Sequence, residues 1–152
     1  MIKWLLGRKI RAFESEFDYD ASYMRDLLQA VGAKGLMSFA RLQGLGTFNQ
    51  GVPVEAWYLA RVVAGALADC GPCAQLVVTM ALRAGVPEKA VTAALSGDDA
   101  TLSTDARAAV AFVRATMARA PEADEHRDEV VRRFGRAGLV TLAYAVTAAR
   151  LY

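Results

Sequence analysis

Cysteine and histidine are scarce in this chain, which holds two cysteines and one histidine among its 152 residues. Two cysteines are too few for a disulfide-rich secreted scaffold. A zinc ion bound by a protein takes four ligands, or three and a water molecule. Cys70, Cys73 and the distant His126 do not supply a closed set within one subunit. We therefore expect no metal, and no motif implies an organic cofactor.

Charge of one sign and long hydrophobic runs are also lacking. The net charge is +2, and without a basic stripe we expect no nucleic-acid partner. The longest uncharged runs, such as 70–82 and 137–149, have 13 residues, whereas a membrane-spanning helix needs about 20. The apolar stretch before Gly7 is only three residues long, shorter than the core of a signal peptide. We expect a cytoplasmic protein without a membrane span.

What is present is typical of a folded helical chain. Hydrophobic residues make up 55% of the sequence and charged residues 22%, which excludes intrinsic disorder. The length fits a single domain over 1–152. Apolar residues recur at helical spacing, as Ala106, Val110, Val113 and Met117 do, and no segment alternates as a strand would. The sequence predicts an all-α fold.

Residues 1–20 are expected to form an N-terminal arm, with a basic start followed by acidic residues. Its hydrophobic side chains, Trp4, Leu5, Phe13 and Phe17, suit docking on the body of the protein. The alternative is a short amphipathic helix on a membrane surface, although one short segment of this kind binds bilayers weakly. A helix is predicted over 21–39, weakened by Gly32 and Gly35, and residues 44–51 are predicted to be a loop.

Helix start and stop signals divide the rest of the chain. Pro53 suits the first position of a helix over 53–68 that is buried nearly all round. We expect a helix from Cys70 to Ala84 that Gly85 stops, and a second helix from Pro87 to Leu95. Ser103 or Thr104 is expected to cap the next helix, and Asp124 to open the one after it. Gly135 and Gly138 are expected to separate that helix from a final one that ends near Arg150.

Cys70-Gly71-Pro72-Cys73 is the pattern that carries chemistry. Residues three apart share a helix face, so the two sulfur atoms can come within reach of a disulfide. The pair falls at a predicted helix N-terminus, where unpaired N–H groups and the helix dipole favour thiolate over thiol. A cysteine pKa of about 8.5 can fall to about 7 in such a motif. These are the requirements for thiol–disulfide exchange.

Cys-Gly-Pro-Cys occurs in thioredoxins, where it follows a β-strand; here an apolar helix precedes it, so a thioredoxin fold is not expected. The helical context resembles the alkyl hydroperoxidase D-like, or carboxymuconolactone decarboxylase-like, family. The residues that carry the resemblance run from Glu55 through Val86, with Ala68-Asp69-Cys70-Gly71-Pro72-Cys73 at their centre. The tail from Asp128 to Gly135 is also similar to the family. The likeness covers residues 50–152 and implies an alkyl hydroperoxidase D-like helical bundle.

The resemblance implies a dithiol oxidoreductase or peroxidase. Cys70 is expected to be the nucleophile because it lies nearest the predicted helix terminus. Cys73 is then the resolving thiol, or the one that meets peroxide. The family pairs its cysteines with a histidine and a glutamate, and this sequence has Val77 and Tyr58 at those positions. Glu55, one helical turn before Tyr58, is the candidate substitute proton carrier. Family members are commonly homo-oligomers, so we expect one here, together with an external dithiol reductant.

Other readings of these residues stay open. The chain can instead be a catalytically degenerate family member that acts as an oligomeric binding or assembly module, as Val77 and Tyr58 suggest. The lactone decarboxylase branch is disfavoured because no polar cluster suits a diacid substrate. Arg61, alone in an apolar helix, is either an anchor between helices or a positive charge near the thiols.

Overall fold

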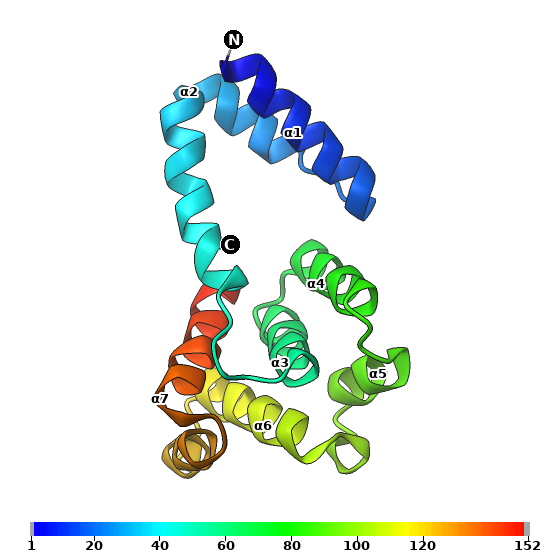
Figure 1. Cartoon of the computed structure of the whole chain (residues 1–152), viewed down its shortest axis with the longest axis vertical. Coiled ribbons are helices and arrows are strands. Elements are labelled where there is room, and N and C mark those ends of the chain that lie inside the picture. The colour runs from blue at the N-terminus through cyan, green and yellow to red at the C-terminus, as the bar shows by residue number, and fades with distance from the viewer. Residues whose placement is uncertain (1, 151–152) are drawn as a thin grey trace. The chain divides into compact units, whose positions relative to one another are not determined.

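The computed structural model describes residues 2–150, and within them every regular element is a helix, with no strand. The predicted all-α fold class is therefore confirmed. The chain divides into two compact units, Met1–Gly44 and Leu45–Tyr152 (Figure 1). The sequence suggests a single domain with an arm over 1–20 and a core from residue 50, whereas the division falls after Gly44. The segment predicted as an arm is one half of a helical pair.

The first unit consists of α1 (Ile2–Phe17) and α2 (Ser22–Gln43), which pack against each other. Ile10 of α1 is buried with Ala21, Leu28 and Leu36, in a core cluster separate from that of the second unit. The Glu14 carboxylate pairs with Arg25 and accepts a hydrogen bond from the Ala21 N–H (3.1 Å). These contacts hold the turn between the two helices.

The second unit is built around α3 (Val54–Leu67), which packs against α4 (Gly71–Arg83), α5 (Glu88–Ser96), α6 (Thr104–Ala118) and α7 (Ala123–Ala149) (Figure 1). Leu59 and Val62 of α3 are fully buried with Val110 and Val113 of α6 and Leu142 of α7. The prediction that the helix after Pro53 is buried nearly all round is confirmed. Short 3-10 turns, η1 (Gly44–Thr47) and η2 (Asp99–Thr101), complete the element order.

The loop before α3 is fixed on α7 by Thr141. The Gln50 N–H donates to Thr141 Oγ1 (2.9 Å), and the Thr141 hydroxyl donates to the Gln50 carbonyl (3.1 Å). Thr141 is fully buried, so its hydroxyl needs these partners. The hydrogen bonds set where α3 begins.

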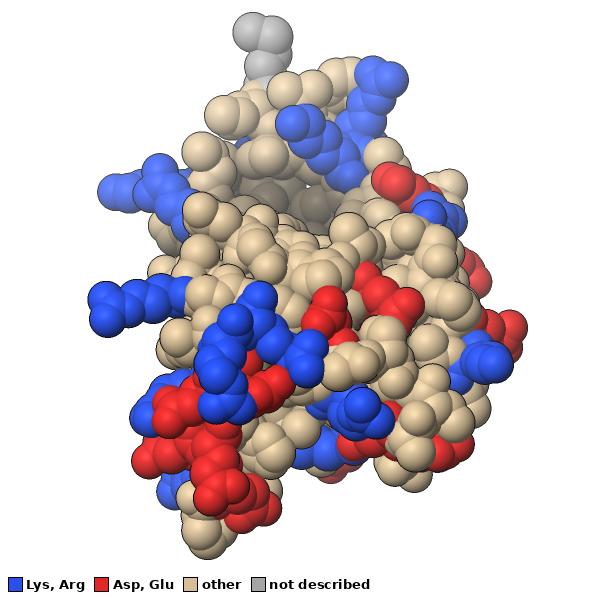
Figure 2. All heavy atoms as spheres, turned by 60° about the horizontal axis from the view of Figure 1, so that its bottom comes forward, with Lys and Arg blue, Asp and Glu red and all other residues tan. Residues whose placement is uncertain are grey.

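The first half of α7 carries interleaved charges of both signs (Figure 2). Arg127 bonds Asp124 (2.7 Å) and Asp128 (3.0 Å). Arg133 bonds Glu129 on its own helix and Asp105 on α6 (3.0 Å). These ion pairs join charges within α7 and tie α7 to α6. Over residues 2–150 no helix is both long enough and apolar enough to cross a bilayer.

Candidate functional site

The Cys70–Cys73 segment sits at a tight reversal between α3 and α4. The Asp69 N–H donates to the Ala66 carbonyl (3.1 Å) and the Cys70 N–H to the Gly65 carbonyl (3.4 Å). This pair of bonds is the Schellman arrangement that closes many helices. It requires a left-handed residue, and here Asp69 takes that conformation with φ of 57°. The reversal ends α3 and starts α4 with one residue between Ala68 and Cys70.

Cys70 is the N-cap residue of α4, as the sequence predicts for the motif. Its carbonyl accepts the first helical hydrogen bond, from the Ala74 N–H (2.9 Å), while its side chain makes no capping bond. Pro72 lies in the first turn, where a missing N–H costs nothing. Cys70 and Cys73 are joined by a disulfide, with their Cα atoms 5.3 Å apart. The sulfur of Cys70 thus lies at the helix terminus, where it is bonded to the sulfur of Cys73.

The Cys70–Cys73 segment lies at the surface. Cys70 and Cys73 are half-buried, and the intervening Gly71 and Pro72 are exposed. A side-chain carbon added at Gly71 would meet no atom within 4 Å. Leu67, one turn before Cys70, is 52% exposed. A partner molecule can therefore approach the motif from solvent.

Gly65 sets how closely α4 begins against α3. A Cβ on Gly65 would lie 3.3 Å from the Cα of Ala74, the residue after Cys73. A larger side chain would push the first turn of α4, and the second cysteine with it, away from α3. The spacing of the two helices at the disulfide therefore depends on this glycine.

Val77 and Tyr58, the positions where the resemblance predicts a histidine and a glutamate, are packing residues. Val77 and Tyr58 are half-buried against the core of the second unit. The Val77 side chain has no group that can take up or give a proton. Arg61 places its guanidinium carbon 4.6 Å from the Trp57 ring centroid and 5.6 Å from that of Tyr58. Both rings belong to α3 itself, so this stacking is a contact within one helix, and both readings of Arg61 remain predictions.

Glu55 is held by the start of α6. Its Oε1 accepts a hydrogen bond from the Ser103 hydroxyl (2.8 Å), and Ser103 caps α6 by accepting from the Ala106 N–H (3.3 Å). Glu55 precedes Gly65, which packs beside the disulfide, by ten residues, about 15 Å along a helix axis. Its role as a proton carrier remains a prediction, and its contact in the structure is with Ser103.

Asp69 is the residue of the site that the sequence analysis does not single out. Its left-handed backbone closes α3 and places Cys70 at the start of α4. The sequence does hold a signal for it: two helices are joined by a very short connection without glycine, the residue that commonly closes a helix, so another residue must take the left-handed conformation. His126 lies apart on α7, and no group of three or more metal-ligating side chains exists among residues 2–150.

Comparison of the chain with family models, curated proteins and solved structures gives no match in any of the three.

Proposed function

We propose that the Cys70–Cys73 pair is a redox-active dithiol and that the protein is a thiol–disulfide oxidoreductase of the alkyl hydroperoxidase D-like type. The observation that carries the proposal is the disulfide between two half-buried cysteines, with exposed Gly71 and Pro72 between them, at the N-terminus of α4. A structural disulfide gains nothing from solvent access, whereas an exchange reaction requires it.

Cys70 is the attacking thiolate in this proposal because it occupies the N-cap position. The free N–H groups of the first turn and the positive end of the helix dipole stabilise a negative charge there. Cys73, one turn along, attacks the resulting mixed disulfide or sulfenic acid and closes the disulfide. Two electrons and two protons leave the dithiol, and an external dithiol returns them.

Val77 determines which acceptor suits the site. The proton relay that a histidine would provide is missing at that position, and general acid–base catalysis typically contributes a factor of about 10² to 10⁴ in rate. We therefore infer that exchange with a disulfide, in which the leaving group is itself a thiolate, is faster than reduction of a peroxide. Glu55 is the remaining candidate for proton transfer, and exchanging it for glutamine tests that role.

The test is mass spectrometry of the reduced protein after mild peroxide or an oxidised dithiol. The proposal predicts loss of two hydrogens from the wild-type chain and their return on treatment with a dithiol reductant. Cys73→Ser is the matched control and is expected to stop at a mixed disulfide or sulfenic acid on Cys70. Retention of both free thiols in the wild type under these conditions contradicts the proposal.

A second candidate is an oligomeric binding or assembly module that has lost catalysis. The observation in its favour is the packing of Val77 and Tyr58 against the core, where the family has acid–base residues. Under this reading the Cys70→Ser variant keeps the oligomeric state and partner binding of the wild type. The thiol assay and size-exclusion chromatography together separate the two candidates. The redox proposal requires exchange activity in the wild type that is lost in Cys70→Ser, whereas the binding module requires only that the variant assembles as the wild type does.

A further inference from the structure

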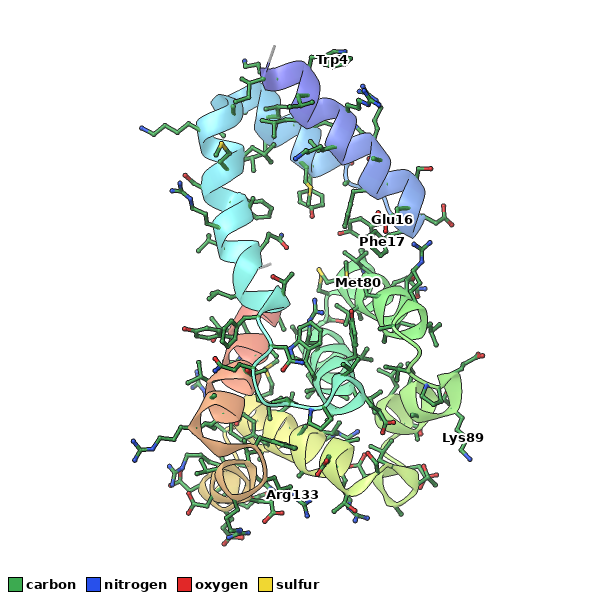
Figure 3. The ribbon with its side chains drawn as sticks, in the orientation of Figure 1. Trp4, Glu16, Phe17, Met80, Lys89 and Arg133 are labelled. Carbon is green, nitrogen blue, oxygen red and sulfur yellow. A yellow bond between two sulfur atoms is a disulfide. The ribbon has the colours of Figure 1, made fainter. Side chains whose placement is uncertain are left out.

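Helix α1 leaves hydrophobic side chains in solvent at its N-terminal end. Its inner face, with Leu6, Ile10 and Phe13, packs in the core shared with α2. Ile2, Trp4 and Leu5 do not take part in that core and are exposed by 58%, 65% and 49%. Figure 3 shows Trp4 projecting outward from the start of the helix. The packing of the first unit thus leaves this end of α1 uncovered.

The same end of α1 is basic. Lys3, Arg8, Lys9 and Arg11 are all exposed, and residues 2–13 contain no aspartate or glutamate. Trp4, Arg8 and Arg11 follow a spacing of four and then three residues, which puts them on one face of the helix. Arg11 Nη1 lies 3.7 Å from the position of a Cβ on Gly7, so its side chain reaches back toward the turn that holds Trp4.

The charge of α1 differs from that of the remaining chain. Residues 2–13 hold four of the 18 lysines and arginines and none of the 16 acidic residues, so the rest of the chain carries a net 14 − 16 = −2. The first acid of α1, Glu14, is engaged by Arg25 and by the Ala21 N–H. The start of α1 is therefore a local cationic and hydrophobic surface on a chain that is otherwise slightly acidic.

We propose that this surface, formed by Ile2, Trp4 and Leu5 with Arg8 and Arg11, docks reversibly on a bilayer that contains anionic lipid. Tryptophan is favoured at the boundary between acyl chains and headgroups, and arginine pairs with lipid phosphates. The isoleucine and leucine side chains gain by leaving water for the acyl region. A nucleic acid offers the same negative charge but no apolar phase for these side chains, so the observations favour the bilayer.

The test uses the full chain and vesicles of phosphatidylcholine with or without phosphatidylglycerol. The proposal predicts cosedimentation with the anionic vesicles only, weakening as salt is raised. Trp57 is 8% exposed in the core, so the expected blue shift of tryptophan emission on binding comes from Trp4 and is absent from Trp4→Phe. Arg8→Gln with Arg11→Gln is expected to lower the vesicle partition coefficient about tenfold or more.

The matched control is Lys34→Gln with Arg41→Gln, which removes the same charge from exposed positions on α2 and is expected to bind as the wild type does. Circular dichroism of each variant confirms that the helices are retained. Equal binding to both kinds of vesicle, no binding, or an equal loss in the control variant overturns the proposal. So does binding of a single-stranded oligonucleotide through Arg8 and Arg11 while the emission of Trp4 stays unchanged with vesicles.

Discussion

Asp69 shows how one residue in an uncommon conformation positions the disulfide. Its φ of 57° lies in the left-handed region, which costs a side-chain-bearing residue roughly 1–2 kcal/mol relative to glycine. We predict that Asp69→Gly raises the free energy of unfolding by about 1 kcal/mol, measured by urea denaturation. The neighbouring Ala68 has a φ of −80°, so Ala68→Gly serves as the control and is expected to lower that free energy. A lower free energy of unfolding in Asp69→Gly, or the same change in both variants, would contradict this role of Asp69.

Glu129 gives a pH-dependent contribution to the stability of α7. Hydrogen bonds from Arg132 and Arg133 lower the pKa of its carboxyl below the ordinary value. The stabilisation is therefore present above the ordinary glutamate pKa and is lost as the pH falls through the lowered one. We predict that carbon NMR of the Glu129 carboxyl shows this depressed pKa, that high salt moves it back up, and that replacing both arginines by glutamine does the same. An unchanged titration in that double variant would contradict the assignment.

At the scale of elements, α2 and α7 are each broken at the first glycine of a Gly-x-x-Gly pair. Gly32 and Gly135 have φ of 70° and 69°. In each case the second glycine lies against the residue just before the break: a Cβ on Gly138 would lie 2.2 Å from the Cβ of Phe134, and one on Gly35 would lie 2.1 Å from Cγ2 of Val31. Any larger residue at the second position of each pair would therefore overlap the side chain that precedes the break.

We predict that Gly138→Ala lowers the free energy of unfolding by about 1–3 kcal/mol, because the added methyl overlaps Phe134 in the core. Gly44→Ala is the control, since a Cβ there meets no atom within 4 Å and its φ of −56° suits any residue. It is expected to change the free energy by less than about 0.5 kcal/mol. Both are measured by denaturant unfolding, and a tolerated Gly138→Ala would contradict the crowded break.

The sequence predicts those helix boundaries that depend on local chemistry. Ser103 caps α6 and Gly85 follows the end of α4, as expected from their capping preferences. The sequence also predicts that Gly135 and Gly138 together separate two helices; the structure has the break at Gly135, and the helix continues through Gly138. Gly138 is needed because it contacts Phe134 across the kink at Gly135. Helical periodicity in the sequence does not reveal a contact across a kink.

At the scale of the whole molecule, the two units have separate hydrophobic cores. The core of the second unit takes all its members from Val52 onward, and that of the first from Leu6 to Leu36. We predict that a chain of residues 45–152 folds alone, with helical circular dichroism, a cooperative thermal transition and the same Cys70–Cys73 redox behaviour as the full chain. A fragment of residues 1–44 is expected to be marginal, since about 40 residues bury little surface. An unfolded 45–152 fragment would contradict the division.

The candidate site is predictable from the sequence only in its local part. The cysteine pair and its helix terminus follow from i, i+3 spacing and from Pro72, and the structure joins the two sulfur atoms. The partners of Glu55 and Arg61 are Ser103 on α6 and the rings of Trp57 and Tyr58. The rings lie three and four residues before Arg61 on α3, so helical spacing encodes that contact. The contact between Glu55 and Ser103 joins two helices and depends on how they pack, which spacing along the chain does not encode.

The pH dependence of Cys70 alkylation in the reduced Cys73→Ser variant tests the central claim most directly. If the start of α4 stabilises a working thiolate, the rate rises with an apparent pKa near about 7. An apparent pKa above about 9, higher than that of an ordinary cysteine at about 8.5, would mean that Cys70 is an inert thiol and that the disulfide has no part in exchange chemistry.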